Sequence, residues 1–262
     1  MNSASPLSGL TILVTRPREQ AAVLAQRIEA LGGQPLIFPL LEITSLSDSP
    51  ALRAQVAQLA DYDLAIFISP NAARHGMQAI LAAGPLPAGL RIASVGPGSS
   101  KVLRELGVSE VLEPHGQFDS EALLALPELQ AVQGWRVQIF RGESGRELLG
   151  ESLKARGAQV EYAACYQRSK PQQDACVLLQ QRLDALTASS SEALGYLNEM
   201  LGPAGQARLA GLPLFVPHPK IAEAARKLGW HQVIATAGAD DGLLAGLVTW
   251  ATQRAQSSGS QS

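Results

Sequence analysis

Short apolar runs rich in β-branched residues alternate along the chain with longer segments of helical periodicity. The runs lie at residues 11–14, 64–68, 91–95, 137–140, 212–216 and 232–235, and each precedes a segment of helical apolar spacing. Parallel strands need long crossover connections, and the helix of such a crossover covers one face of the sheet. The alternation therefore predicts an α/β protein with parallel sheets flanked by helices.

The two halves of the sequence carry matching landmarks in the same order. The matched pairs are Arg16 with Arg141 (125 positions apart), Ser69 with Ser190 (121), Arg104 with Arg226 (122) and Glu121 with Asp241 (120). Any two α/β segments share part of such a pattern, so duplication is one of two interpretations. If it is right, the chain folds into two similar lobes.

Two segments, 34–43 and 159–168, are longer than a typical strand of five or six residues. Either segment could leave one sheet and connect the lobes, and together they could pair as a two-stranded β-ladder hinge. Pro35 and Pro39 favour an edge position for the first segment, because proline donates no hydrogen bond to a neighbouring strand.

Composition and motifs exclude several classes of function. The net charge is -2, so the chain lacks the overall positive charge that is typical of nucleic-acid-binding proteins. It also has no apolar run long enough to span a membrane and no pattern of a secretory signal peptide. Cys165 and Cys176 and the four histidines show no metal-ligand spacing, and P-loop and GxGxxG motifs are missing. We therefore expect a cytoplasmic protein without metal or nucleotide cofactor.

The segment 254–262 lacks apolar periodicity and is predicted to be a disordered tail.

The turns that follow the predicted strands are the places where ligands bind in open parallel sheets. Small hydroxyl residues, glycines and prolines dominate these turns, with a few isolated cations. A Ser or Thr before a helix is ordinarily an N-cap, but several helix N-termini on one edge also form an anion site. Two tyrosines, Tyr162 and Tyr166, lie four residues apart on the second long segment and are expected to share one face of a strand.

Taken together, these residues resemble the uroporphyrinogen-III synthase family. The resemblance runs from Leu10 to about Thr249 and rests on the order of several weak motifs, among them Ile12-Leu-Val-Thr-Arg-Pro17, Phe67-Ile-Ser-Pro-Asn-Ala72, Ser94-Val-Gly-Pro-Gly98, Arg141-Gly-Glu-Ser-Gly-Arg146 and Cys165-Tyr-Gln-Arg168. Two departures are Gly98-Ser99, where the family commonly has a larger residue before Thr, and Pro217-His218-Pro219, which replaces a Gly-Pro turn.

The resemblance implies two α/β lobes joined by a two-stranded ladder. The first lobe would hold residues 1–37 with 170–262, and the second residues 38–169. It also implies closure of the linear tetrapyrrole hydroxymethylbilane to uroporphyrinogen III, with inversion of ring D and loss of water, by a monomer that needs no cofactor.

The resemblance further implies roles for particular residues. Tyr166 would be the catalytic acid, because a phenol is protonated at neutral pH. The substrate carboxylates would be bound by the strand-end residues Arg16, Ser69, Gly96, Ser99, Ser100, Arg141, Gly142, Arg146, Ser189, Ser190 and Lys220. Two alternatives stay open: a non-catalytic two-lobed protein that binds a small ligand, and a sugar-nucleotide transferase.

Overall fold

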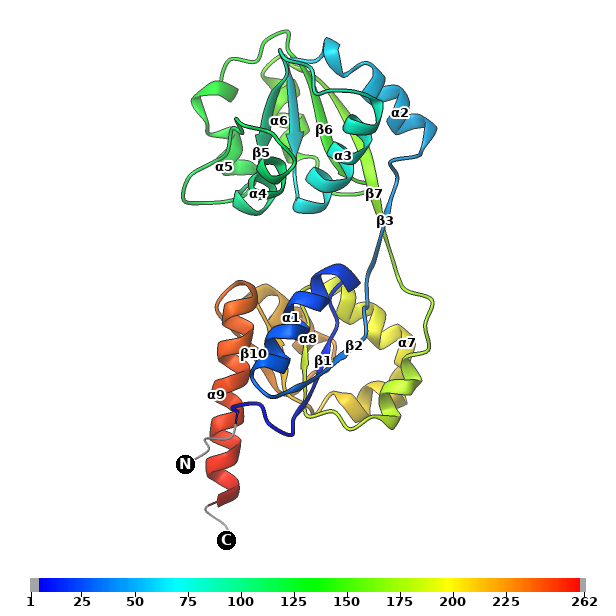
Figure 1. Ribbon diagram of the computed structural model, residues 1–262, viewed down its shortest axis with the longest axis vertical. Coiled ribbons are helices and arrows are strands. Elements are labelled where there is room, and N and C mark those ends of the chain that lie inside the picture. The colour runs from blue at the N-terminus through cyan, green and yellow to red at the C-terminus, as the bar shows by residue number, and fades with distance from the viewer. Residues whose placement is uncertain (1–4, 260–262) are drawn as a thin grey trace. The chain divides into compact units, whose positions relative to one another are not determined.

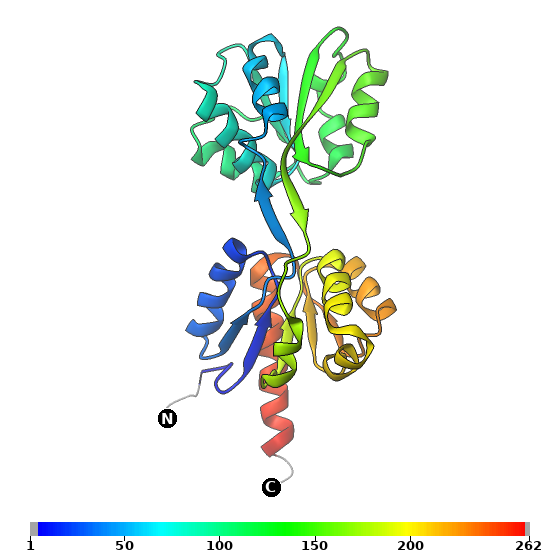
Figure 2. The same ribbon diagram turned by 90° about the vertical axis from the view of Figure 1, so that its right-hand side faces the viewer.

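The computed structural model describes residues 5–259, and this part of the chain forms two compact units (Figures 1 and 2). The first unit contains the chain up to Glu42 and again from Ser169, and the second unit is Ile43–Arg168. Each unit has its own five-stranded sheet among the described residues. The predicted α/β class with two helix-flanked, largely parallel sheets is confirmed.

The sheet of the first unit has the strand order β10-β9-β8-β1-β2, and every neighbouring pair is parallel. Helices α7 and α8 pack on one face, against Leu13, Leu186 and Leu214, while α1 and α9 pack on the other. Strand β2 contains Pro35 and lies at the edge, as its proline predicts. The elements are β1 Thr11–Val14, α1 Arg18–Ala30, β2 Gln34–Ile37, the 3₁₀ helix η3 Ala175–Gln180, β8 Ala185–Thr187, α7 Ser191–Leu209, β9 Leu214–Val216, α8 Pro219–Lys227, β10 Val233–Ala235 and α9 Ala239–Gly259.

The sheet of the second unit has the order β3-β7-β6-β4-β5, in which β4, β5, β6 and β7 are parallel. Helices α2, α3 and α4 cover one face, and α5 and α6 cover the other. Strand β3 runs beside β7 in the opposite direction (Figure 2). The elements are β3 Glu42–Ser45, α2 Pro50–Ala57, η1 Leu59–Asp61, β4 Leu64–Phe67, α3 Pro70–Ala83, β5 Arg91–Ser94, α4 Pro97–Glu105, α5 Ser120–Leu124, η2 Pro127–Leu129, β6 Arg136–Gly142, α6 Leu148–Ala155 and β7 Gln159–Ser169.

The two sheets share one topology, which supports the internal duplication. The order β2-β1-β8-β9 in the first unit corresponds to β7-β6-β4-β5 in the second. The place of β10 is taken by Leu112, which forms an isolated parallel bridge to Ala93. In each unit the connections change direction between two central strands, β1 and β8 or β4 and β6. The carboxyl ends of such a strand pair form a crevice that favours ligand binding.

The first long segment, 34–43, is not one strand. It divides into β2 and β3, which belong to different sheets. Between them, Phe38 and Leu40 donate backbone hydrogen bonds to Val14 (2.9 Å) and Thr15 (3.1 Å) and join the first core. The chain therefore passes to the second unit after Glu42, five residues later than expected, and returns after Arg168.

The prediction of a disordered tail from residue 254 is wrong for residues 254–259, which continue α9; residues 260–262 lie outside the described chain. Arg254 donates to Asp184, whose carboxylate also accepts from the Thr11 amide, so the end of α9 is fastened to the sheet. Alanine, glutamine and arginine have high intrinsic helix propensity, so they form a helix here even without apolar periodicity.

No helix among residues 5–259 has the length and apolar character needed to cross a membrane.

Helix α3 packs closely on the sheet through Gly76. A Cβ at this position would lie 2.8 Å from Phe140 and 2.9 Å from Phe67, whose rings stack at 4.7 Å. We expect Gly76→Ala to destabilise the second unit by about 1–2 kcal/mol, because overpacking outweighs the gain in helix propensity. Gly195→Ala in α7, which meets open space, should stabilise the first unit by about 0.5–1 kcal/mol. Hydrogen exchange of the β4 amides measures the stability of the second unit, and exchange of the β8 amides measures that of the first. If the two variants change the free energy of opening by the same amount and in the same direction, the packing argument is wrong.

Candidate active site

The carboxyl edge of the second sheet brings several predicted site residues together. Ser69 follows β4 and caps α3, accepting the Ala72 amide at 3.0 Å. Arg141 and Gly142 end the neighbouring strand β6. These residues therefore lie at the point where the connections of the second unit change direction, which is the expected place for a ligand.

A β-bulge decides where Tyr166 points. Arg141 pairs with Ala164, but the next residue, Gly142, pairs with Tyr166, so Cys165 is an extra residue in β7. The bulge places Tyr166 in the cluster with Ala163 and Cys165, whereas Tyr162 packs against the opposite cluster. The expectation that the two tyrosines share a face is therefore wrong, because one inserted residue reverses the alternation.

The bulged residue is itself held by the backbone around it. The Cys165 thiol lies 3.3 Å from the Arg141 carbonyl and 3.6 Å from that of Ala72. Burial raises the pKa of this thiol to about 12, so it stays protonated and can donate. These contacts link the bulge to β6 and to the first turn of α3.

Tyr166 is 3% exposed, and its hydroxyl oxygen lies between a serine and an arginine. Ser69 Oγ is 3.2 Å away, and Arg168 Nη2 donates to the same oxygen at 3.4 Å. Gly142 makes room for the ring, since a Cβ there would lie 3.1 Å from it. When Ser69 is the donor, the phenol receives two hydrogen bonds and its own proton is available for another acceptor.

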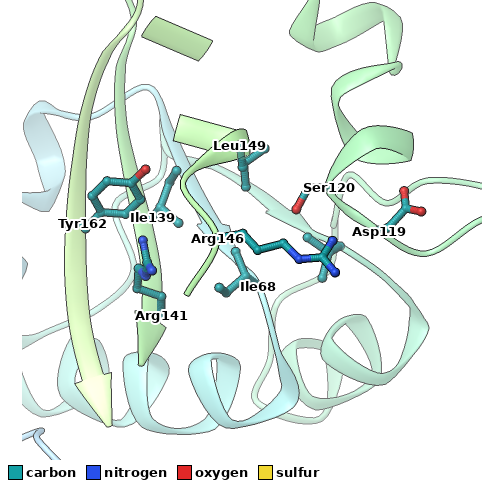
Figure 3. Close-up of a pocket in the computed structure, with 9 residues that line it drawn as sticks. Ile68, Asp119, Ser120, Ile139, Arg141, Arg146, Leu149 and Tyr162 are labelled. Atoms are coloured by element: carbon teal, nitrogen blue, oxygen red, sulfur yellow. The ribbon is translucent and has the colours of Figure 1, made fainter. Parts of the chain in front are cut away.

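On the other face of the sheet, Arg141 lies beside a pocket of about 230 Å³ (Figure 3). Its side chain is 6% exposed, donates to Glu147 at 2.8 Å and lies over the Tyr162 ring at 4.7 Å. Burial and the Glu147 carboxylate raise the pKa of Tyr162 to about 12. Hydrogen bonds from Tyr162 and Arg141 lower the pKa of Glu147. The acid is thus held ionised between a phenol and a guanidinium.

The same pocket accounts for another predicted residue, Arg146. Figure 3 shows Arg146 extending from the loop before α6 towards Asp119 and Ser120 at the start of α5. Ile68, Val95, Ile139 and Leu149 supply the apolar part of the lining. The pocket thus combines two guanidinium groups with an apolar wall, an arrangement suited to a carboxylate on an apolar ligand.

The remaining predicted residues of the second unit surround the start of α4. Gly96 is its N-cap and packs against Phe118, where a Cβ would lie 2.9 Å from the Phe118 Cβ. Ser99 is 3% exposed and Ser100 is fully buried, with the Ser100 hydroxyl 2.7 Å from that of Ser94. The structure therefore places these two hydroxyls in the interior, away from the surface of the turn.

The predicted residues of the first unit gather at the carboxyl edge of its own sheet. Arg16 follows β1 and forms an ion pair with Asp240 in the first turn of α9. Ser190 caps α7 by accepting the Ala193 amide at 3.0 Å, and Ser189 precedes it, half-buried. Lys220 is exposed in the first turn of α8 and donates its amide to His218 Nδ1.

Sequence reasoning missed Arg168, Glu147 and Ser120 as site residues. Arg168 is two strand positions from Tyr166, so its proximity could have been found from spacing, whereas the contacts of Glu147 and Ser120 depend on tertiary packing. Among residues 5–259, no three His, Cys, Asp or Glu side chains gather in the way that a metal site needs.

Comparison with known proteins assigns the chain to a family. The family model described as Uroporphyrinogen-III synthase HemD matches residues 22–245. The uroporphyrinogen-III synthase of Salmonella typhimurium is 33% identical over 241 residues, which cover 90% of this chain and 98% of that protein. The protein of the same name from Escherichia coli K12 is 32% identical with the same coverage.

Two solved structures share the fold. A mutant form of the uroporphyrinogen III synthase of Thermus thermophilus aligns with a TM-score of 0.62 at 22% identity, covering 94% of this chain and 100% of that one. The enzyme of Helicobacter pylori 26695 aligns with a TM-score of 0.59 at 13% identity, covering 92% and 99%. The chain therefore belongs to the uroporphyrinogen-III synthase family.

Proposed function

We propose that the protein converts hydroxymethylbilane to uroporphyrinogen III with inversion of ring D. The observation that carries the proposal is the similarity to curated synthases, which spans 90% of this chain and 98% of the relatives. Because the net reaction releases one water, the enzyme would be a lyase. Action as a cytoplasmic monomer belongs to the same proposal.

The proposed chemistry begins at the terminal hydroxymethyl group of the bilane. Its C–O bond breaks with assistance from the pyrrole nitrogen, which leaves an azafulvene cation. Ring D then attacks through its substituted carbon, and the resulting spiro intermediate fragments and closes again with the ring inverted. The pyrrole supplies the electron pair, so the protein has to assist departure of hydroxide, fold the chain and disfavour direct closure.

Tyr166 is the group that we assign to the departure of hydroxide. Its O–H bond breaks as the proton passes to the leaving oxygen, and water departs. Two contacts support this role: Arg168 donates to the phenol oxygen at 3.4 Å, and Ser69 lies 3.2 Å from it. Both contacts hold the phenol oxygen in position, and a proton released later in the reaction restores the phenol.

The carboxylates of the substrate are assigned to the strand-end turns of both units. Arg141 and Arg146 beside the pocket, together with the backbone at Gly96 and Gly142, would bind them in the second unit. Arg16, Ser189, Ser190 and Lys220 would do so in the first. The buried hydroxyls of Ser99 and Ser100 would act through the shape of the turn, because they point into the interior.

Product analysis tests the proposed function directly. The purified protein is incubated with enzymatically generated hydroxymethylbilane, and the product isomers are separated after oxidation. The expected product is the isomer with ring D inverted, because spontaneous closure leaves that ring in its original orientation. If the substrate binds but only the uninverted isomer forms, the protein is a non-catalytic two-lobed binding protein.

Ser69 has two roles that a matched serine separates. We expect Ser69→Ala to cost about 1 kcal/mol of stability through the lost N-cap and to slow turnover about two- to tenfold through the lost contact with Tyr166. Ser49 also precedes a proline and caps a helix of the same unit, accepting the Leu52 amide at 3.2 Å. Ser49→Ala should therefore lose similar stability and keep its turnover. If both variants have the same turnover, Ser69 has no role in catalysis beyond capping its helix.

A further inference from the structure

The Arg141 guanidinium has a hydrogen-bond acceptor for one of its N–H groups and none for another. Nη1 donates to Glu147 at 2.8 Å, whereas the buried Nε has no hydrogen-bond partner among the described residues. The side chain is 6% exposed, and it lines both the pocket of about 230 Å³ and an adjoining one of about 400 Å³. A buried N–H without a partner is costly, so this group favours a further acceptor.

The duplication shows what the equivalent position of the first unit contains. Arg16 corresponds to Arg141, and it forms its ion pair with Asp240 at the start of α9, although its own Nε is also buried without a hydrogen-bond partner among the described residues. At the offset of 120 positions, Asp240 corresponds to Ser120 at the start of α5, which lines the pocket beside Arg141. The second unit therefore has a hydroxyl where the first has the carboxylate. Asp119 also lines the pocket, but its Oδ1 accepts the Ala122 amide and caps α5.

The partner that Arg141 has instead is held less firmly than the partner of Arg16. The Glu147 side chain is 54% exposed, and that of Asp240 is 22% exposed. Ion pairs with a solvent-exposed partner contribute little free energy, so another carboxylate can replace Glu147 at small cost. A ligand carboxylate in the pocket would find Arg141 and Tyr162 on one side and Arg146, next to Ser120, on the other (Figure 3).

We infer that Glu147 occupies Arg141 as a substitute for a substrate carboxylate and that the substrate displaces it on binding. This inference rests on the proposed function and adds a step to it: one side-chain carboxylate of the bilane exchanges with Glu147 on the guanidinium. Glu147 thus keeps the buried cation paired in the free enzyme, and it weakens substrate affinity because it competes for the same donors.

Three variants of helix α6 and the turn before it test the exchange. Glu147→Gln removes the competing charge, and Glu147→Asp keeps the charge but shortens the reach. Both should lower the KM for hydroxymethylbilane about three- to fivefold with kcat within twofold of wild type, the factor expected for a partly exposed ion pair. Glu151→Gln, an equal change of charge one turn further along α6, should leave the KM unchanged.

The outcomes separate the inference from the proposed function. An unchanged or higher KM for both Glu147 variants, with turnover intact, overturns the exchange and leaves the synthase activity standing. If the KM falls equally in Glu151→Gln, the effect comes from the change in net charge, and this result also overturns the exchange. If the wild-type protein forms no inverted isomer, the proposed function itself fails.

Discussion

We expect Tyr166→Phe to slow formation of the inverted isomer by about ten- to a thousandfold, with product affinity nearly unchanged. General acid assistance is typically worth about 10² to 10⁴ in rate, and a water molecule in place of the hydroxyl would restore part of it. The substitution removes one oxygen and keeps the ring, which is 3% exposed and packs against Gly142. Single-turnover kinetics with separated product isomers measure the loss.

The control for this variant is a tyrosine at the other end of the same sheet. Tyr62 is 5% exposed and lies before β4, with Arg136 over its ring at 4.4 Å. Tyr62→Phe makes the same chemical change in a comparably buried position, so its turnover should equal that of the wild type. If Tyr62→Phe and Tyr166→Phe behave alike, the hydroxyl of Tyr166 is not the acid, and preorganised binding of the folded bilane would have to account for catalysis.

Tyr162→Phe does not serve as a control for Tyr166→Phe, although the spacing in the sequence indicates that the two tyrosines are neighbours on one strand face. A regular strand would place it beside Tyr166, but the bulge at Cys165 puts the two rings in different clusters. Tyr162 instead contacts Glu147 and Arg141, so its loss should alter the KM more than the rate of the chemical step.

The strand pattern of this chain was most predictable for the central strands that are buried on both faces, such as β4. The run 64–68 is continuously apolar, as central parallel strands are, and all six predicted runs contain strands of the structure. Strand β8 was not among those runs, because Ala185–Thr187 is only three residues long and two of these residues, Ala185 and Thr187, are small or polar. Its place follows from the duplication, which matches it to β4.

The site was less predictable, because its geometry depends on tertiary contacts and on one irregularity. Nothing in Ala164-Cys165-Tyr166 marks a bulge, which arises where β7 pairs with the end of β6. The burial of Ser99 and Ser100 depends in the same way on how α4 packs against Ser94. By contrast, the cap at Ser69 and the arginine at the carboxyl end of β6 follow from local rules for helix starts and strand ends, and the structure has both.

The second large effect that we expect is on substrate affinity. Arg141→Met should raise the KM for hydroxymethylbilane about ten- to a hundredfold, because a hydrogen bond between charged groups contributes about 1.5–3 kcal/mol. Methionine keeps apolar contact with the Tyr162 ring, and Glu147 is 54% exposed, so no buried charge is left unpaired. The kcat should change much less, since the role proposed for Arg141 is to bind a substrate carboxylate and not the leaving group.

A matched arginine and a double variant make this result specific. Arg104 forms an ion pair with Glu113 on the surface of the same unit, so Arg104→Met should leave the KM unchanged. In the Arg141→Met background, Glu147→Gln should no longer lower the KM, because the donors for which it competes are gone. If Glu147→Gln still lowers the KM in that background, Glu147 acts on the substrate by another route, and the carboxylate of the substrate does not bind at Arg141.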